Sequence, residues 1–289
     1  MNKGVFSQIS LTSYELTFIL IACISAISIG VFFAKKQTRA FELVGREGVR
    51  FFDYGDMRFL HLGSPTVQGS MRISKPFDIH LEYVQRMMAW LLFIDLRKLN
   101  QLHAMQLGLG AASLTKFCHH HLAMQTTAIE INPEVIKICQ RWFNLPESSD
   151  TFQVIQEDAL KIISDSQWYE KIDVLQVDLY DEKNAIPELN SESFYRNCRQ
   201  LLTQDGCMTV NIFGKNSNIG ESLQRIVSVF GFKSVWAFKP TKAGNTIVLA
   251  FKKPQTLEAT NLLSQAKIVE ARWPLPSTRW IKKLAPVET

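Results

Sequence analysis

Short stretches of alternating apolar and polar residues follow one another between residues 41 and 80. Turn residues such as Gly45 and Gly55 separate them. This spacing predicts strands at 41–44, 49–54 and 57–62. The period then changes, because apolar residues recur at helical spacing over 81–95. The pattern therefore predicts a small antiparallel β module over 41–80, followed by a helix.

From residue 102 onward, apolar runs of strand length alternate with segments of helical period. The predicted strands are 103–107, 126–131, 152–156, 172–178, 206–213, 233–238 and 245–251. The predicted helices are 111–121, 133–143, 158–166, 191–203 and 217–230. Such alternation is typical of an α/β domain whose parallel sheet has helices on both faces, and we assign this domain to 81–254. Its last two strands predict an antiparallel hairpin at the sheet edge. Residues 255–289 predict a C-terminal helix and an irregular tail.

The segment Leu16–Ala34 carries no charge and differs from the rest of the chain. As a helix it would be roughly 28 Å long, close to the thickness of a bilayer core. Lys35, Lys36 and Arg39 follow it, a charge bias that places the following domain in the cytosol. Residues 1–40 therefore predict a transmembrane helix and linker that anchor the following domain, in the cytosol, to the membrane. A cleaved signal peptide and a buried helix are the alternatives.

Composition sets limits on partners. The formal charge of +5 is concentrated near the N-terminus, and no basic stripe with interleaved aromatic residues is present, so we expect no nucleic-acid partner. The five cysteines form no CxxC pair, which favours reduced thiols. Three consecutive histidines, 119–121, would point in different directions on a helix, so we expect no metal site there.

Two features predict a nucleoside site. Gly108 and Gly110 follow the strand at 103–107, where glycine allows a sharp turn and close approach of a ligand to the backbone. Glu130 ends the next strand, 22 residues after Gly108, where a carboxylate can accept hydrogen bonds from ribose hydroxyls. Asp158 ends the third strand, where it could accept from an adenine amino group or cap the next helix.

Two further carboxylates indicate chemistry at the mouth of the same cleft. Asp178 ends the apolar strand predicted at 172–178, so its carboxylate should lie at the carboxyl edge of the sheet. An acid there can accept a proton from an attacking amine. Asp181 lies three residues later and could contact the same cationic substrate. A solvated loop would also carry such acids.

These motifs resemble the spermidine synthase family of polyamine aminopropyltransferases, and most closely its bacterial spermidine synthase-like branch. The similar segments, which span roughly residues 41–252, are VQG (67–69), Tyr83, GLGAAS (108–113), EIN (130–132), EDA (157–159) and DLYD (178–181). The resemblance implies a Rossmann-like S-adenosylmethionine-dependent methyltransferase fold behind the β module. It also implies transfer of an aminopropyl group from decarboxylated S-adenosylmethionine to a polyamine such as putrescine.

The resemblance also implies roles for single residues. Asp178 would be the catalytic base, and Asp181 would bind the amine. Gln68 and Tyr83 fall on positions that line the substrate cleft. Gly108, Gly110, Glu130 and Asp158 would bind the nucleoside. Members of the family commonly form dimers or tetramers, so a homo-oligomer is also implied.

This sequence departs from the family pattern at two positions that face the substrates. The glycine loop usually reads GGGDGG, and Ala111 stands here in place of its aspartate. The acid that usually follows the cleft tyrosine is missing from Tyr83-Val84-Gln85. The donor could therefore be decarboxylated or intact S-adenosylmethionine. Two alternatives follow, a methyltransferase that uses the intact donor and a nucleoside-binding protein without turnover.

Overall fold

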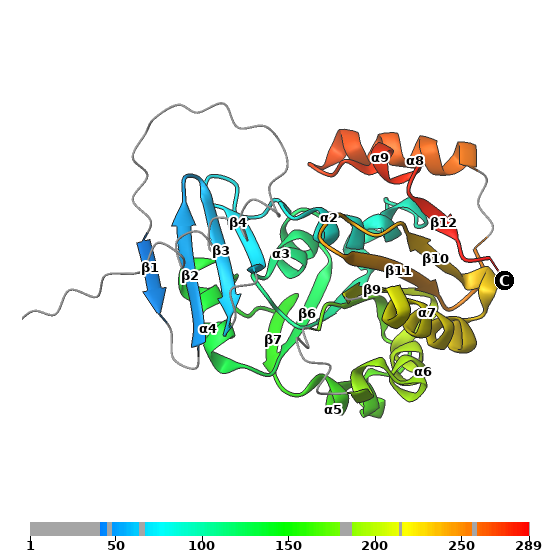
Figure 1. The fold of residues 1–289 in the computed structure, drawn as a ribbon, viewed down its shortest axis with the longest axis horizontal. Helices are drawn as coiled ribbons and strands as arrows, with labels where there is room; N and C mark the ends of the chain where they lie inside the picture. The colour runs from blue at the N-terminus through cyan, green and yellow to red at the C-terminus, as the bar shows by residue number, and fades with distance from the viewer. Residues whose placement is uncertain are drawn as a thin grey trace, which may run out of the picture.

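The computed structural model describes residues 41–44, 48–63, 67–179, 187–213, 216–255 and 259–288. The predicted anchor at 16–34 lies outside these ranges. Within them, no helix is both long enough and apolar enough to cross a bilayer. The described chain forms two sheets that lie side by side in Figure 1, with the small one at the N-terminal side.

The small sheet is antiparallel, with the strand order β1-β2-β3-β4. Its strands are β1 (Phe41–Val44), β2 (Val49–Tyr54), β3 (Met57–Leu62) and β4 (Val67–Arg72). The first three match the prediction, and β4 adds a strand that carries Gln68 to the large domain. Buried Phe51 and Leu60 face the glycine loop and α4 (Pro133–Trp142), so the small sheet forms one wall of the cleft.

The large sheet has the strand order β12-β10-β11-β9-β8-β5-β6-β7. Its parallel part consists of β5 (His103–Leu107), β6 (Gln125–Glu130), β7 (Phe152–Gln156), β8 (Ile172–Val177) and β9 (Leu202–Phe213). The antiparallel part consists of β11 (Asn245–Phe251), β10 (Val235–Phe238) and β12 (Leu284–Pro286). The predicted α/β fold with a small antiparallel sheet in front is therefore confirmed.

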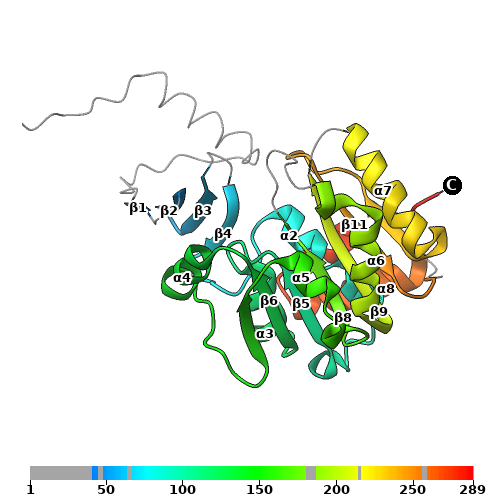
Figure 2. The same ribbon diagram turned by 90° about the horizontal axis from the view of Figure 1, so that it is seen from below.

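Helices cover both faces of the large sheet (Figures 1 and 2). One face is covered by α2 (Glu82–Met87), α3 (Ser113–His120), α8 (Ala259–Arg272) and α9 (Ser277–Trp280). The other is covered by α5 (Ala159–Ser164), α6 (Glu192–Leu201) and α7 (Asn216–Phe230). Neighbouring strand residues alternate between the two cores, since Val174 packs with the first set and Leu175 with the second. Strands buried on both faces explain the continuous apolar runs.

The structure corrects three of the predicted elements. The helix expected over 81–95 ends at Met87, and a 3-10 turn at Ala89–Leu92 continues it. These four residues are completely or almost completely buried. A fully buried segment is apolar at every position, so its period cannot distinguish the two helix types.

Strand β9 begins at Leu202, inside the predicted helix 191–203, because its pairing with β8 starts before a register shift.

The third correction concerns the edge of the sheet. Strands β10 and β11 form the expected antiparallel pair, but β11 lies inside the sheet between β9 and β10. The edge is β12, which pairs with β10 and was expected to be part of an irregular tail. Three residues ending in Pro286 carry almost no strand signal, and proline is tolerated at an edge because its missing N–H leaves no ladder bond unmade.

The strand order reverses direction between β5 and β8. Strand β6 follows β5 on one side, whereas β8 lies on the other side of β5. Ligands of open parallel sheets bind outside the carboxyl ends of the strands at such a reversal. The loops after β5 and β8, which hold Gly108 and Asp178, are therefore the expected place for a site.

Candidate active site

The glycine turn after β5 touches the backbone of Asp178. Gly108 has φ +84° and Gly110 has φ +51°, conformations that glycine adopts without strain. A Cβ added to Gly108 would lie 2.4 Å from the carbonyl oxygen of Asp178. The Asp178 N–H in turn donates to the Leu107 carbonyl at 3.0 Å. Glycine at 108 therefore lets the two sequence motifs meet.

Gln106 stabilises the glycine turn through a side-chain hydrogen bond, a role that the sequence analysis did not predict. It is buried in β5, and its Nε2 donates to the Gly108 carbonyl at 2.6 Å. The Thr115 hydroxyl on α3 donates to Gln106 Oε1 and fixes the orientation of the amide. The signal was a single glutamine within an apolar strand, and a buried polar side chain of this kind requires partners.

Glu130 ties the glycine turn to the loop after β6. Its Oε2 accepts from the Leu109 N–H and its Oε1 from the Asn132 N–H, both at 2.9 Å. Burial raises the pKa of this carboxyl, and the bonds from the backbone N–H groups partly offset that effect. Each carboxylate oxygen has two lone pairs, so both can still accept from a ribose hydroxyl. The neighbouring Ile131 is 65% exposed, which leaves an apolar surface beside the carboxylate.

Asp158 caps α5 in this structure. Its Oδ1 accepts from the Leu160 N–H at 2.9 Å, which is the capping role left open by the sequence. The role in adenine binding stays a prediction. Neither Asp158 nor Glu130 lines the cavity beside Asp178, so these two acids occupy a different part of the cleft from Asp178, whereas Gly110 of the glycine turn lines that cavity.

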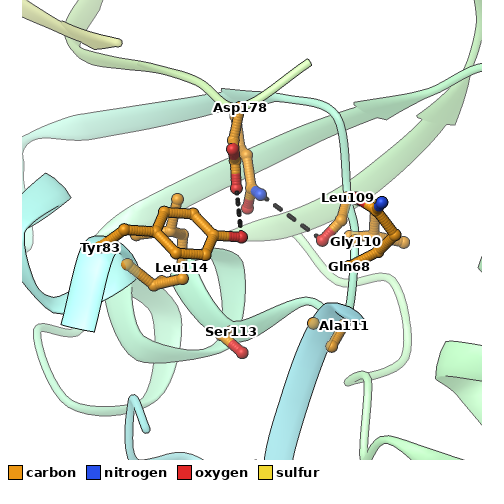
Figure 3. A pocket seen from close by; sticks show the side chains of 11 residues that line it. Gln68, Tyr83, Leu109, Gly110, Ala111, Ser113, Leu114 and Asp178 are labelled. Atoms are coloured by element: carbon orange, nitrogen blue, oxygen red, sulfur yellow. Dashed lines mark hydrogen bonds between the residues drawn. The ribbon is translucent and has the colours of Figure 1, made fainter. Parts of the chain in front are cut away.

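Asp178 lines the cavity from the end of β8, and the Tyr83 side chain points toward it (Figure 3). Its Oδ1 accepts from Asn211 Nδ2 at 2.9 Å, and its Oδ2 accepts from the Tyr83 hydroxyl at 3.3 Å. Burial raises the pKa of the Asp178 carboxyl above its ordinary value, and these two hydrogen bonds partly offset the rise. Burial also raises the pKa of Tyr83 well above its ordinary value, so its hydroxyl stays protonated as a donor. The Asp178 carboxylate can therefore serve as an acceptor for the proton of an attacking amine.

A small cavity lies in front of Asp178. It is lined by Gln68, Gly69, Tyr83, Val84, Gln106, Leu109, Gly110, Ala111, Ser113, Leu114 and Asp178. The resemblance placed Gln68 and Tyr83 there, and the structure brings both to this cavity. Asp181 falls in the undescribed segment 180–186, so its role stays a prediction.

Ala111 stands in the wall of this cavity and packs against β4. It is 3% exposed, and a Cβ added to Gly69 would lie 2.5 Å from the Ala111 Cβ. Glycine at 69 therefore lets β4 approach the glycine loop. Within the described cavity lining, Asp178 is the acidic side chain. The position where the family carries a second acid contributes only a methyl group here.

The three histidines at the end of α3 pack against neighbouring side chains. The ring of His119 lies 4.9 Å from that of Phe152, and the rings of His120 and His121 contact each other. His121 Nε2 lies 3.0 Å from Asp78 Oδ1, whereas the His120 ring stacks on Phe77 with centroids 3.9 Å apart. Across the described ranges, no group of three potential ligands could hold a metal ion. Four cysteines, Cys118, Cys139, Cys198 and Cys207, are free and buried.

Comparison with known proteins gives consistent matches over this region. The sequence profile of the spermine/spermidine synthase domain matches residues 108–262. A polyamine aminopropyltransferase of Neisseria meningitidis serogroup A is 36% identical over 199 residues, 68% of this chain and 73% of the relative. One of Chromobacterium violaceum is 30% identical over 241 residues, 82% of this chain and 88% of the relative.

Among solved structures, a probable spermidine synthase from Corynebacterium glutamicum has the same fold. It superposes with a TM-score of 0.66 at 16% sequence identity, covering 80% of this chain and 88% of that one. The fold prediction, a Rossmann-like domain of the methyltransferase type behind a small antiparallel sheet, agrees with this likeness.

Proposed function

Because the chain belongs to the spermine/spermidine synthase family, we propose that it transfers an aminopropyl group from decarboxylated S-adenosylmethionine to a polyamine such as putrescine. The amine nitrogen attacks the carbon next to the sulfonium, and the bond from that carbon to sulfur breaks. Sulfur keeps the electron pair, so neutral methylthioadenosine leaves. The nitrogen loses a proton, which Asp178 accepts. No metal ion is needed for this step.

The observation that carries the proposal is the environment of Asp178. Its side chain is half-buried at the carboxyl end of β8, lines the cavity and accepts hydrogen bonds from Tyr83 and Asn211. A partly shielded carboxylate attracts a cationic amine more strongly than a fully exposed one, because water screens the charge less. Most of the rate should come from alignment of amine and sulfonium in the cleft. Identification of the amine and nucleoside products with each donor tests the proposal.

Binding of the donor is assigned to the glycine turn and to the ends of β6 and β7. We propose that Gly108 and Gly110 admit the nucleoside close to the backbone and that Glu130 accepts from its ribose hydroxyls. Asp158 is proposed at the adenine side, where its Oδ2 remains for a ligand while Oδ1 caps α5. Gln68, Tyr83 and Asp181 are proposed to contact the amine.

A methyltransferase that uses the intact donor is the second candidate, and Ala111 is the observation that favours it. An aspartate here would attract the amine of the decarboxylated donor and repel the carboxylate of the intact one. Alanine does neither, and specificity is a difference of affinities that often relies on a repulsive element. The wild-type protein should therefore discriminate weakly between the two donors.

The variant Ala111→Asp should favour the decarboxylated donor by about tenfold, the effect of roughly 1.4 kcal/mol. Competition binding of both donors measures this, and Ala111→Asn is a control of equal size without the charge. Equal preference in Ala111→Asp and Ala111→Asn would show that the charge at 111 does not select the donor.

The membrane anchor and the oligomer rest on sequence alone. We propose that 16–34 anchors the protein to the inner membrane with its catalytic domain in the cytosol, because this segment is uncharged and basic residues follow it. The full chain should then remain with membranes after carbonate extraction, and its recovery uncleaved in the soluble fraction would contradict the anchor. A homo-oligomer is proposed from the family alone.

A further inference from the structure

A chain of hydrogen-bonded side chains leads from Asp178 away from the cavity. Asn211 on β9 donates to Asp178, and its own Oδ1 accepts from Asn245 Nδ2 at 3.1 Å. Asn245, the first residue of β11, has its Oδ1 3.4 Å from the Thr241 hydroxyl. The Asn245 N–H donates to that hydroxyl at 3.0 Å, and the Thr241 N–H donates to the Asn245 carbonyl at 2.8 Å.

The direction of each bond between side chains in this chain follows from the negative charge of the Asp178 carboxylate. An ionised carboxylate only accepts hydrogen bonds, so Asn211 must turn its NH₂ group toward Asp178. The amide oxygen of Asn211 then faces Asn245 and requires a donor there. Asn245 supplies its NH₂ group, which leaves its oxygen for the Thr241 hydroxyl. Asn245 and Thr241 are 7% and 8% exposed, so water has little access to replace these partners.

We infer that Asn245 is a positioning residue for the reaction, which acts through Asn211 to keep Asp178 ionised and correctly oriented. The inference rests on the proposed role of Asp178 as the base. Asn245 does not line the cavity, so it is not assigned a contact with either substrate. Its effect on the reaction is transmitted by the amide of Asn211.

The hydrogen bonds at the end of this chain counteract the effect of burial on the pKa of Asp178. Burial raises the Asp178 pKa, and the bonds from Asn211 and Tyr83 oppose the rise. The Asn211 bond is the shorter one, at 2.9 Å against 3.3 Å for Tyr83. Within the described residues, α2 contributes the titratable Tyr83, β9 contributes the neutral Asn211, and the glycine turn contributes only backbone at Gly108. Loss of the Asn211 bond should therefore raise the pKa of Asp178 directly.

The test is the titration of the Asp178 carboxyl in the full-length protein. Aspartate labelled with ¹³C in its side-chain carboxyl reports ionisation by NMR, and loss of a signal in Asp178→Asn assigns the resonance. Asn211→Leu should raise the titration midpoint by about one pH unit, the effect of a hydrogen bond to a charged group. Asn245→Leu should raise it by about half a unit, the effect of a neutral bond.

The variant Asn245→Asp tests the same chain by replacing the donor to Asn211 with an acceptor. A carboxylate at this position accepts only, so Asn211 must turn its NH₂ group away from Asp178 and present its oxygen instead. The midpoint should rise by about one unit or more, because the new negative charge acts in the same direction. Thr246→Val is the matched control. Thr246 is the adjacent residue of β11, is 4% exposed and has an unpartnered hydroxyl within the described chain, so this variant should leave the midpoint unchanged.

The pH dependence of kcat/KM separates this inference from the proposed function. The acid limb should move upward with the NMR midpoint in each variant, since a base with a higher pKa is lost at a higher pH. Unchanged midpoints in Asn211→Leu and Asn245→Asp would overturn the positioning role. Midpoints that move while the acid limb stays in place would leave the hydrogen-bond chain intact and contradict Asp178 as the base.

Discussion

Asp178→Asn is expected to lower kcat by about a hundredfold or more, the scale on which a general base contributes. Asparagine keeps the size of the side chain and can still bond to Tyr83 and Asn211, but it cannot accept the proton of the attacking amine. The affinity for methylthioadenosine should change little, because Glu130 and Asp158 do not line the cavity that Asp178 faces. Steady-state kinetics and calorimetry measure the two quantities.

Asp205→Asn is the matched control for this variant. The side chain of Asp205 is 89% exposed and forms an ion pair with Lys253. Asp205 lies near the start of β9, whereas Asn211, which contacts Asp178, lies near the end of that strand. It should leave both turnover and nucleoside affinity unchanged. Normal turnover in Asp178→Asn would remove Asp178 as the base, and a parallel loss of nucleoside affinity would show that the residue shapes the whole cleft.

Gly108→Ala is expected to give the second large loss, about a hundredfold in kcat/KM. Alanine at φ +84° is strained by roughly 1–2 kcal/mol. In the present backbone, its Cβ would also lie 2.4 Å from the carbonyl oxygen of Asp178, so the loop after β5 or the loop after β8 must move. A displacement of about 1 Å at a reacting group can reduce the rate a hundredfold. Steady-state kinetics measures the loss.

Gly231→Ala separates backbone strain from the contact with Asp178. Gly231 has φ +85°, almost the same conformation, but an added Cβ would meet no heavy atom within 4 Å. Backbone strain should cost both variants about 1–2 kcal/mol in the free energy of unfolding, and Gly108→Ala alone should lose activity. If Gly108→Ala keeps nearly full activity, the close approach of the glycine turn does not position Asp178.

The sequence was most informative where turn residues bound a strand on both sides. Strands β2, β3, β5, β7 and β11 have the predicted limits, in the small sheet as well as in the large one. It was least informative where local preference is overridden. Ala112 adopts φ +57° before α3, although an alanine normally avoids that region, and nothing in the local sequence indicates it.

Some residues of the candidate site could be predicted from the sequence and others could not. Gly108, Glu130 and Asp178 could be placed by their positions at strand ends, since the carboxyl edge of a parallel sheet gathers such residues. Asn211 and Asn245 could not, because their partnership depends on the antiparallel pairing of β9 with β11 and on side chains from distant segments. Gln68 and Tyr83 were found through resemblance, since no periodic pattern marks a tyrosine that reaches Asp178.

The most direct measurement of the central claim is mass spectrometry of the products formed by the full-length protein from putrescine and each sulfonium donor separately. With decarboxylated S-adenosylmethionine, the account predicts methylthioadenosine and putrescine extended by one aminopropyl group, and at least about a hundredfold less of both with Asp178→Asn. Formation of S-adenosylhomocysteine and a methylated amine from the intact donor, with no aminopropyl product from the decarboxylated one, would contradict it.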